Sequence, residues 1–236
     1  IITSTDGITW TSRTSGTSSN IGGVTFGNDI FFALDASKNV IKSTDNGTTW
    51  NISSNSPMGG VIYGLAFGNG KLVYPGSHSG GTGWMFVSSD NGSTWDNRTF
   101  STTRATYDVT FGNGMFATAS NWRNVYSSSD NGSSWGNNFG SEAAVALWGI
   151  GYGNGSFIVV GDYLTILSGN NNSGFSVINN PGSGASLQDA TGANDVFVVV
   201  GNSGTILTSS DNGTTWDNRT STSVTTTSLK DVIYSE

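Results

Sequence analysis

The sequence predicts an all-β protein, a six-bladed β-propeller built from four-stranded blades. Three observations lead to this fold class. A short motif recurs six times at intervals of about forty residues, the length of a propeller blade. Short apolar runs alternate with Gly- and Asn-containing turns. The composition is rich in Gly (34 residues) and low in charged residues (11%), so helices are not expected.

The repeated motif has the form Ser-x-Asp-x-Gly-x-x-Trp. Its six copies read STDGITW from Ser4, STDNGTTW from Ser43, SSDNGSTW from Ser88, SSDNGSSW from Ser128, SGNNNSGF from Ser168 and SSDNGTTW from Ser209. Their closing aromatic residues are Trp10, Trp50, Trp95, Trp135, Phe175 and Trp216. The first copy is one residue short, and the fifth has Asn170, Asn172 and Phe175 in place of Asp, Gly and Trp. Because Asn tolerates the left-handed conformation, we expect the fifth turn to form.

Each repeat contains four runs of strand length. In the third repeat they are VTFGNG from Val109, MFATAS from Met115, a run that ends in the motif, and a run that begins at Trp135. The second run is the most continuously apolar, as in VFVVVG from Val196. We therefore expect the second strand of each blade to be buried on both faces, and the fourth strand to lie outermost.

The repeated motif resembles the Asp-box, also called the bacterial neuraminidase repeat. Five of the six copies keep both the Asp and the Trp of that motif, and the resemblance covers the whole chain. It implies a propeller in which the Asp side chain accepts backbone N–H groups in the turn between the third and fourth strands. Gly supplies a positive φ in this turn, and the Trp packs into the gap between blades.

We expect residues 1–236 to form a single domain. Five blades are expected at about 21–60, 61–104, 105–145, 146–185 and 186–228, and a split sixth blade combines 1–20 with 229–236. First strands are expected around Val24, Leu65, Val109, Ile150, Ala190 and Val232.

The split blade lacks a second strand, because the chain opens at IITSTDGITW, which corresponds to a third strand. Two explanations stay open. Either about ten residues upstream of Ile1 belong to the mature protein, or another chain supplies the strand by β-augmentation. In both cases the blade is closed by the two termini.

Charge and composition exclude several partners and cofactors. The net charge is −7 and no Lys/Arg cluster interrupts the chain, so nucleic acid is not expected as a partner. No run approaches eighteen consecutive apolar residues, so insertion into a membrane is not expected either. The absence of Cys excludes disulfides and Cys-ligated zinc. The repeated motif also lacks the carboxylate spacing of an EF-hand, so we expect no metal and no cofactor.

The resemblance to the Asp-box family raises the possibility of a sialidase, whose three arginines converge near the propeller axis. Arg13, Arg98 and Arg219 all occur three residues after a motif Trp, which places them on outermost strands instead. The single histidine, His78, lies in a Gly/Ser-rich loop. We therefore expect no enzyme activity, although a glycosidase that uses a pair of Asp residues stays open.

Specificity is expected where the repeats differ. The position two residues before the first-strand apolar residue reads Gly22, Tyr63, Tyr107, Trp148, Gln188 and Lys230, and the next reads Gly23, Gly64, Asp108, Gly149, Asp189 and Asp231. The loops between second and third strands on the three aromatic blades add Trp84, Trp122, Arg123, Asp162 and Tyr163. Aromatic faces beside Asp, Asn and Arg suit a sugar ring, so we expect a ligand site formed by Tyr63, Tyr107, Trp148, Trp84, Trp122, Arg123, Asp108, Asp162 and Tyr163. The alternative is that the aromatic residues only fill the channel.

The sequence thus favours a non-catalytic recognition module that binds a cell-surface glycan or protein. The repeats look like those of secreted bacterial and phage tail-associated proteins, which implies an extracellular, cell-surface or virion location. A second hypothesis is a structural subunit of a surface filament or layer, in which neighbouring copies donate strands to one another. A sialidase-like glycoside hydrolase is the third.

Overall fold

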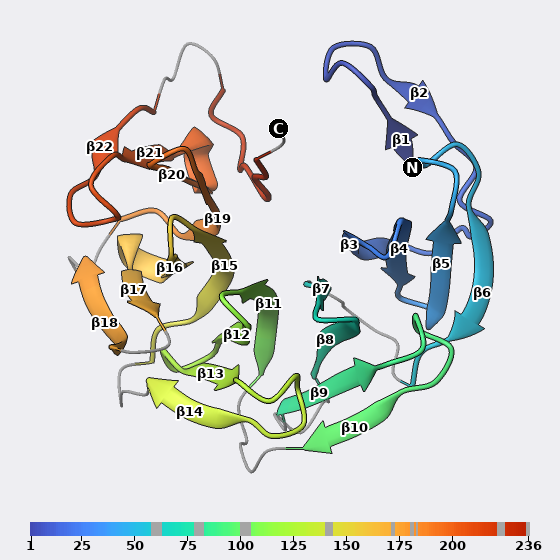
Figure 1. Cartoon of the computed structure of the whole chain (residues 1–236). Coiled ribbons are helices and arrows are strands. Elements are labelled where there is room, and N and C mark those ends of the chain that lie inside the picture. The colour runs from blue at the N-terminus through green and yellow to red at the C-terminus, as the bar shows by residue number, and fades with distance from the viewer. Residues whose placement is uncertain are drawn as a thin grey trace.

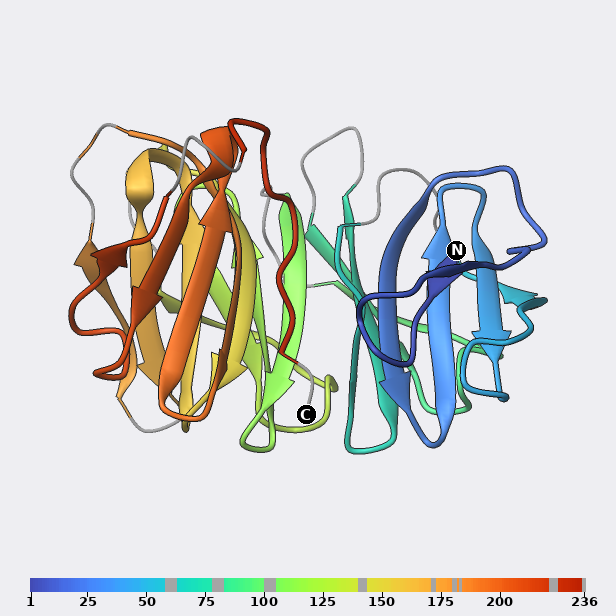
Figure 2. The same ribbon diagram turned by 90° about the horizontal axis from the view of Figure 1, so that it is seen from above.

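The computed structural model describes residues 1–57, 63–77, 83–99, 105–139, 144–170, 173–179, 182, 184–220 and 225–234. Within these residues the strands form five four-stranded antiparallel sheets and one two-stranded sheet. The sheets are arranged as blades around a common centre (Figure 1). Seen from above, the inner strands run roughly along the central axis (Figure 2). The six-bladed all-β fold is therefore confirmed.

The strands follow the same inner-to-outer order in each complete blade. Blade 1 contains β3 (Ile21–Gly27), β4 (Ile30–Asp35), β5 (Asn39–Ser43) and β6 (Asn51–Asn55). Blade 2 contains β7 (Ala66–Gly68), β8 (Lys71–Ser77), β9 (Gly83–Ser88) and β10 (Asp96–Thr99). Blade 3 contains β11 (Thr106–Gly112), β12 (Met115–Ser120), β13 (Val125–Ser128) and β14 (Gly136–Phe139).

Blade 4 contains β15 (Leu147–Gly153), β16 (Ser156–Gly161), β17 (Ile166–Asn170) and β18 (Gly174–Asn179). Blade 5 contains β19 (Leu187–Ala193), β20 (Val196–Gly201), β21 (Ile206–Ser209) and β22 (Asp217–Asn218). Blade 6 has the short pair β1 (Ile2–Thr3) and β2 (Thr11–Ser12). The helical elements in the described residues are the 3-10 turns η1 (Asp162–Leu164) and η2 (Asn202–Gly204).

The second strands form the core of each blade, as their apolar sequences predict. Every residue of β12 is buried, and so are the last four residues of β4. The fourth strands are largely exposed, as in β6 and β14. An apolar run with no polar alternation therefore occupies the strand that is covered on both faces.

Blades pack through a repeated contact between a first strand and the second strand of the preceding blade. Leu65 belongs to the same buried cluster as Phe32 and Leu34 of β4. Ile150 is clustered in the same way with Ala117 and Ala119 of β12. Each interface thus depends on a second strand being present in the preceding blade.

The Asn-Gly turns of the repeat have two structural roles. In the turn between β7 and β8, Asn69 has a φ of 46° and Gly70 a φ of 72°, the left-handed pair that a tight hairpin requires. The Asn69 side-chain amide also donates a 2.9 Å hydrogen bond to Asn131 Oδ1 in the repeated turn of the next blade. Asn28 donates to Asn91 Oδ1 in the same way at 3.1 Å. The asparagines therefore connect neighbouring blades.

The repeated motif forms the turn between third and fourth strands, as predicted. Asp90 accepts hydrogen bonds from the backbone N–H groups of Ser93 (3.0 Å) and Thr94 (2.8 Å). Its carboxylate also accepts the hydroxyl protons of Thr94 and Ser88. These bonds, led by that of the Thr94 hydroxyl, lower the pKa of Asp90 to about 2. Gly92 has a φ of 79°, which favours glycine.

The motif aromatic residues are less uniformly buried than expected. Trp50 and Phe175 are buried, while Trp95, Trp135 and Trp216 are half-buried, each with its ring in a core cluster. Trp10 contradicts the expectation, because 56% of its surface is exposed. Its own blade lacks the second strand against which the other motif aromatic rings pack.

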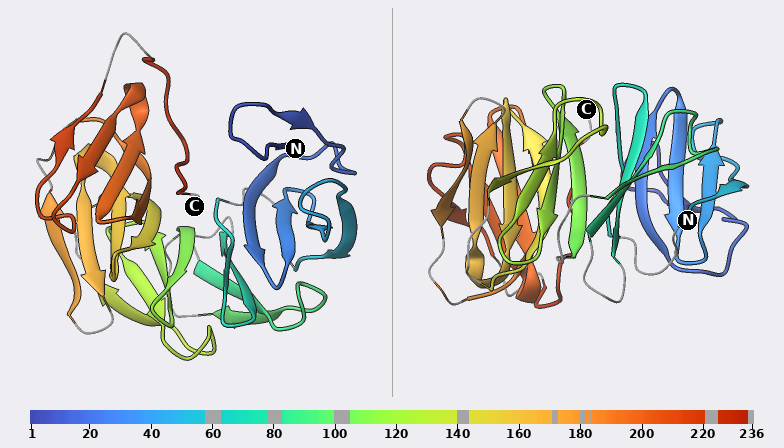
Figure 3. Two further views of the ribbon diagram at one scale, coloured as in Figure 1. Left: turned by 45° about the horizontal axis from the view of Figure 1, so that its top comes forward. Right: turned by 90° about the horizontal axis from the view of Figure 1, so that it is seen from below.

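The sixth blade consists of separate pieces that come from the two termini. The C-terminal segment 229–234 is not a strand, but it occupies the place of one. Asp108 Oδ2 on β11 accepts the Ile150 N–H on the next inner strand at 3.0 Å. Asp189 Oδ2 on β19 accepts the Val232 N–H at 2.9 Å in the corresponding position. The segment thus lies where the innermost strand of blade 6 belongs, and it faces β1 and β2 across an opening in the ring (Figure 3).

Candidate functional site

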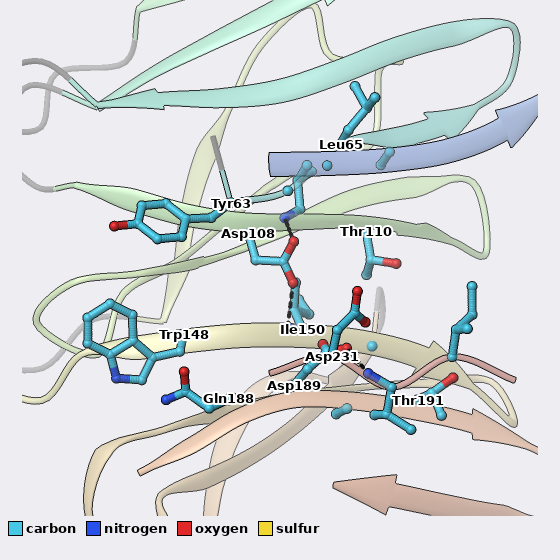
Figure 4. A pocket seen from close by; sticks show the side chains of 18 of the residues that line it. Tyr63, Leu65, Asp108, Thr110, Trp148, Ile150, Gln188, Asp189, Thr191 and Asp231 are labelled. Atoms are coloured by element: carbon cyan, nitrogen blue, oxygen red, sulfur yellow. Dashed lines mark hydrogen bonds between the residues drawn. The ribbon is translucent and has the colours of Figure 1, made fainter. Parts of the chain in front are cut away.

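The inner strands surround a cavity of about 930 Å³ at the propeller centre. Its wall comes from β3, β7, β11, β15 and β19 and from the C-terminal segment, so every blade contributes to it. The close view shows aromatic and amide side chains towards one end, with carboxylates next to them (Figure 4). A cavity of this size accommodates a small oligosaccharide or a short peptide.

Three aromatic rings meet at this end of the cavity. The Tyr63 and Tyr107 rings are in edge-to-face contact with centroids 5.5 Å apart, and the Tyr107 and Trp148 centroids are 4.5 Å apart. Trp148 Nε1 donates a 2.8 Å hydrogen bond to Asp162 Oδ1, which also accepts the Ser186 hydroxyl at 2.7 Å. The three rings thus contact one another in the order Tyr63, Tyr107, Trp148, and the first of them, Tyr63, is 50% exposed. The structure therefore brings together four of the residues expected from the sequence.

The same end of the cavity carries two polar side chains that the expected site omitted. Lys230 Nζ donates a 2.9 Å hydrogen bond to Gln188 Oε1, and both residues line the cavity. They occupy the same position in their repeats as Tyr63, Tyr107 and Trp148. That repeat position was the signal that could have identified them.

A group of three carboxyl groups lies next to the aromatic rings. Asp108, Asp189 and Asp231 share one repeat position, and all three line the cavity (Figure 4). Burial raises the pKa of Asp108 to about 7. Burial also raises the pKa of Asp189 to about 9, with further contributions from the charge of Asp108 and a hydrogen bond with Asp231. Part of this group is therefore protonated at neutral pH and able to donate hydrogen bonds.

The remaining expected site residues do not line the cavity. Trp84 packs against Phe86 with centroids 6.1 Å apart, in the interface between blades 1 and 2. Trp122 is exposed on the loop after β12, whereas the adjacent Arg123 is buried. Tyr163 is 46% exposed in η1. Trp84 lies on β9, and the other three lie on connections between second and third strands, so sharing the same three blades does not place their side chains in the cavity wall.

The positive φ of Tyr163 is a feature of the repeat. Tyr163 has a φ of 60°, and Ser203 in the matching turn of blade 5 has a φ of 58°. In both turns a following Thr donates its N–H to the first turn residue, Thr165 to Asp162 and Thr205 to Asn202. This backbone conformation therefore belongs to the connection between second and third strands rather than to a ligand site.

The described arginines do not form a carboxylate-binding triad. Arg98 pairs with Asp96 at 2.8 Å on the outermost strand of blade 2, and Arg219 pairs with Asp217 at 2.9 Å next to β22. Arg13 Nε donates to the Thr3 hydroxyl. All three lie on the periphery, as their sequence positions predict. His78 and Arg104 lie outside the described residues. No three His, Asp or Glu side chains in the described part of the chain are placed to hold a metal ion.

Comparisons with known proteins bear on the fold. No protein-family model matches the chain, and no curated protein matches it. The structure of YCF48 bound to D1 peptide is similar, with a TM-score of 0.64 and 15% identity over 86% of this chain and 68% of that one. The computationally designed Ika8 protein has a TM-score of 0.66 and 9% identity over 93% of this chain and 67% of that one. At these identities the likeness shows a β-propeller fold alone. No helix among the described residues is long and apolar enough to span a membrane.

Proposed function

We propose that the protein is a non-catalytic recognition module that binds a cell-surface glycan at the aromatic end of its central cavity. The observation that carries this proposal is the series Tyr63, Tyr107, Trp148, which ends in a half-exposed ring beside hydrogen-bonding groups. A pyranose ring stacks its C–H face on such a ring while its hydroxyls reach polar neighbours. Gln188, Lys230 and the protonated carboxyl groups supply both donors and acceptors.

The negative charge of the protein and of its cavity wall favours neutral over acidic glycans. The chain carries a net charge of −7, and among the described residues four carboxyl groups line the cavity beside one cation, Lys230. A carboxylated or sulfated sugar is repelled by this surface, whereas a neutral hexose-based glycan is not. We therefore expect neutral glycans to bind and sialylated ones to bind at least tenfold more weakly.

The resemblance of the repeated turn to the Asp-box supports an extracellular, cell-surface or virion location, because similar repeats are found in secreted bacterial and phage tail-associated proteins. The alternative ligand is an extended peptide from a cell-surface protein. It is favoured by the similarity to YCF48 bound to D1 peptide. Both ligands use the same cavity, and the experiment below distinguishes them.

The test compares Tyr63→Ala with Tyr163→Ala on an array of neutral and acidic glycans. Both tyrosines are about half exposed, so neither substitution should disturb folding, but only Tyr63 lines the cavity. We expect Tyr63→Ala to weaken glycan binding at least tenfold and Tyr163→Ala to leave it unchanged. Equal binding by both variants contradicts a site at the aromatic rings. Binding of peptides but of no glycan, with the same loss in Tyr63→Ala, favours the peptide ligand.

A further inference from the structure

The chain contains seven Asn-Gly pairs, and they occupy two kinds of turn. An Asn that precedes Gly is prone to cyclise, because its side-chain carbonyl carbon can be attacked by the next backbone nitrogen and glycine has no side chain to hinder the approach. Four pairs lie in the motif turns, at Asn46, Asn91, Asn131 and Asn212. Three lie at the tips of the hairpins between first and second strands, at Asn69, Asn113 and Asn154.

The motif turns protect their own Asn-Gly pairs. In each of the four, the glycine is buried, and its N–H donates a hydrogen bond of 2.8–2.9 Å to the hydroxyl of the motif serine, as Gly92 does to Ser88. Cyclisation requires this nitrogen to lose its proton and to turn towards the Asn side chain. The hydrogen bond opposes both steps.

The hairpin tips lack this protection, and Asn154 lacks a further restraint that Asn69 has. Gly70 and Gly155 are exposed, and a Cβ on either would meet nothing within 4 Å. The Asn69 side chain is fixed, because its amide donates a 2.9 Å hydrogen bond to Asn131 Oδ1. The Nδ2 atom of Asn154, in contrast, has no hydrogen-bond partner among the described residues. The leaving group of Asn154 is therefore not held by a hydrogen bond that the reaction must break.

The side-chain carbonyl of Asn154 is also polarised by the neighbouring blade. Asn154 Oδ1 accepts the backbone N–H of Asp195, in the hairpin between β19 and β20, at 3.2 Å. Attack on this carbonyl places negative charge on Oδ1, and an N–H that already points at the oxygen stabilises that charge. Asn154 thus combines an exposed glycine, an unbonded amide nitrogen and a polarised carbonyl.

We propose that Asn154 is the site at which the folded protein deamidates. Gly155 N gives up its proton to hydroxide and bonds to Asn154 Cγ. The Cγ–Nδ2 bond then breaks, and Nδ2 takes a proton from water and leaves as ammonia. Water opens the resulting cyclic imide at either of its carbonyl carbons, which yields aspartate or isoaspartate, so each event consumes one water and releases one ammonia. This inference does not depend on the glycan site.

Either product changes the turn between β15 and β16. This turn has two residues, Asn154 and Gly155, between the paired residues Gly153 and Ser156. Isoaspartate inserts a methylene group into the backbone, so the loop no longer has the length of a two-residue hairpin turn. Aspartate keeps the backbone but places a negative charge beside Asp195. The isoaspartate form should therefore melt at a lower temperature than the aspartate form.

The test incubates the folded 236-residue chain at pH 8 and follows each Asn-Gly pair by peptide mapping and mass spectrometry. Asn69 is the matched comparison, because it occupies the same hairpin position. We expect Asn154 to deamidate about tenfold faster than Asn69 in the folded chain. In urea, where the structural differences between the two turns are lost, the two rates should agree within about twofold.

Two variants separate the causes. Asn131→Gly tolerates the φ of 58° at this position and removes the acceptor of the Asn69 amide. It should raise the rate at Asn69 and leave the rate at Asn154 unchanged. Gly155→Ala adds a Cβ that meets no neighbouring atom but hinders the attacking nitrogen, so it should slow deamidation at Asn154 several-fold without affecting Asn69.

Three results overturn the proposal. The first is equal rates at Asn154 and Asn69 in the folded chain. The second is faster deamidation at Asn91 or Asn131 than at Asn154, which would show that the serine hydrogen bond does not protect the motif turns. The third is the same ratio of the Asn154 and Asn69 rates in urea as in the folded chain, which would make the preference a property of the local sequence rather than of the structure.

Discussion

Replacing Asp189 by Asn should change how the stability of the protein depends on pH. Asp189 lines the cavity with Asp108 and Asp231, and burial raises its pKa to about 9. A carboxyl group with a raised pKa in the folded state destabilises folding as pH rises above its unfolded pKa of about 3.9, because the unfolded state then loses its proton freely whereas the folded state still holds it. Below that pH the effect is absent.

The magnitude follows from the pKa shift. Each pH unit between the unfolded and folded pKa values costs about 1.4 kcal/mol for one group, so the interval from pH 4 to pH 8 gives an upper bound of about 5 kcal/mol. Solvent in the cavity screens this cost, and we take about 2 kcal/mol as the net value. The Asn side chain keeps an oxygen that can accept the Val232 N–H, so this hydrogen bond need not be lost. At pH 8, Asp189→Asn should therefore melt about 4–8 °C higher than the parent chain.

The assay is thermal unfolding followed by circular dichroism from pH 4 to pH 9. Asp195→Asn is the matched control, because Asp195 lies exposed in the hairpin between β19 and β20. The difference in melting temperature between Asp189→Asn and the parent should be small at pH 4 and grow with pH, while Asp195→Asn should follow the parent throughout. A constant difference at all pH values would refute the reasoning, because it would mean that Asp189 does not titrate differently in the two states.

Three further predictions concern the repeated turn. At four of these turns the hydrogen bonds lower the pKa of the carboxylate to about 2. The stability that these carboxylates contribute is therefore present above pH 4 and should be lost as pH falls from 4 towards 2, which unfolding measured across an acid titration will show. In chemical denaturation, Trp95→Ala should lower the free energy of unfolding by about 2–4 kcal/mol and Trp10→Ala by under about 1 kcal/mol. The reason is that of these two rings only that of Trp95 lies in a core cluster, and equal losses would contradict it. Gly213→Ala should destabilise the protein more than Gly155→Ala in the same measurement. Both glycines have a φ near 80°, but a Cβ on Gly213 would lie 2.8 Å from Ile158, whereas a Cβ on Gly155 would meet nothing within 4 Å.

The sequence predicted the blades because every repeat must solve the same packing problem. The continuous apolar character of VFVVVG from Val196 indicated a doubly covered strand, and the Asp and Gly of the motif indicated its turn. The exposure of Trp10 was not anticipated, although the missing second strand was identified from the sequence. The error was to treat the motif Trp as a local feature of its turn, when its burial depends on a strand elsewhere in the blade.

The candidate site was predictable only along the inner strands. Tyr63, Tyr107 and Trp148 share one repeat position, so the symmetry of the propeller brings them together. Trp84 lies at the start of the third strand β9, and Trp122 lies on the connection between β12 and β13; repeat position on the inner strands does not determine where these side chains point. The raised pKa values of the cavity carboxyl groups depend on burial, which the sequence alone does not reveal.

In the part of the chain described by the structure, the opening in blade 6 leaves the blades in a linear array rather than a closed ring. In such an array each blade is stabilised by its own folding and by contacts with its immediate neighbours, so local unfolding starts at the two ends. Blade 1 and blade 5 occupy these ends, and blade 3, whose strand β12 is fully buried, lies in the middle. Amide exchange should accordingly slow from both ends towards β12.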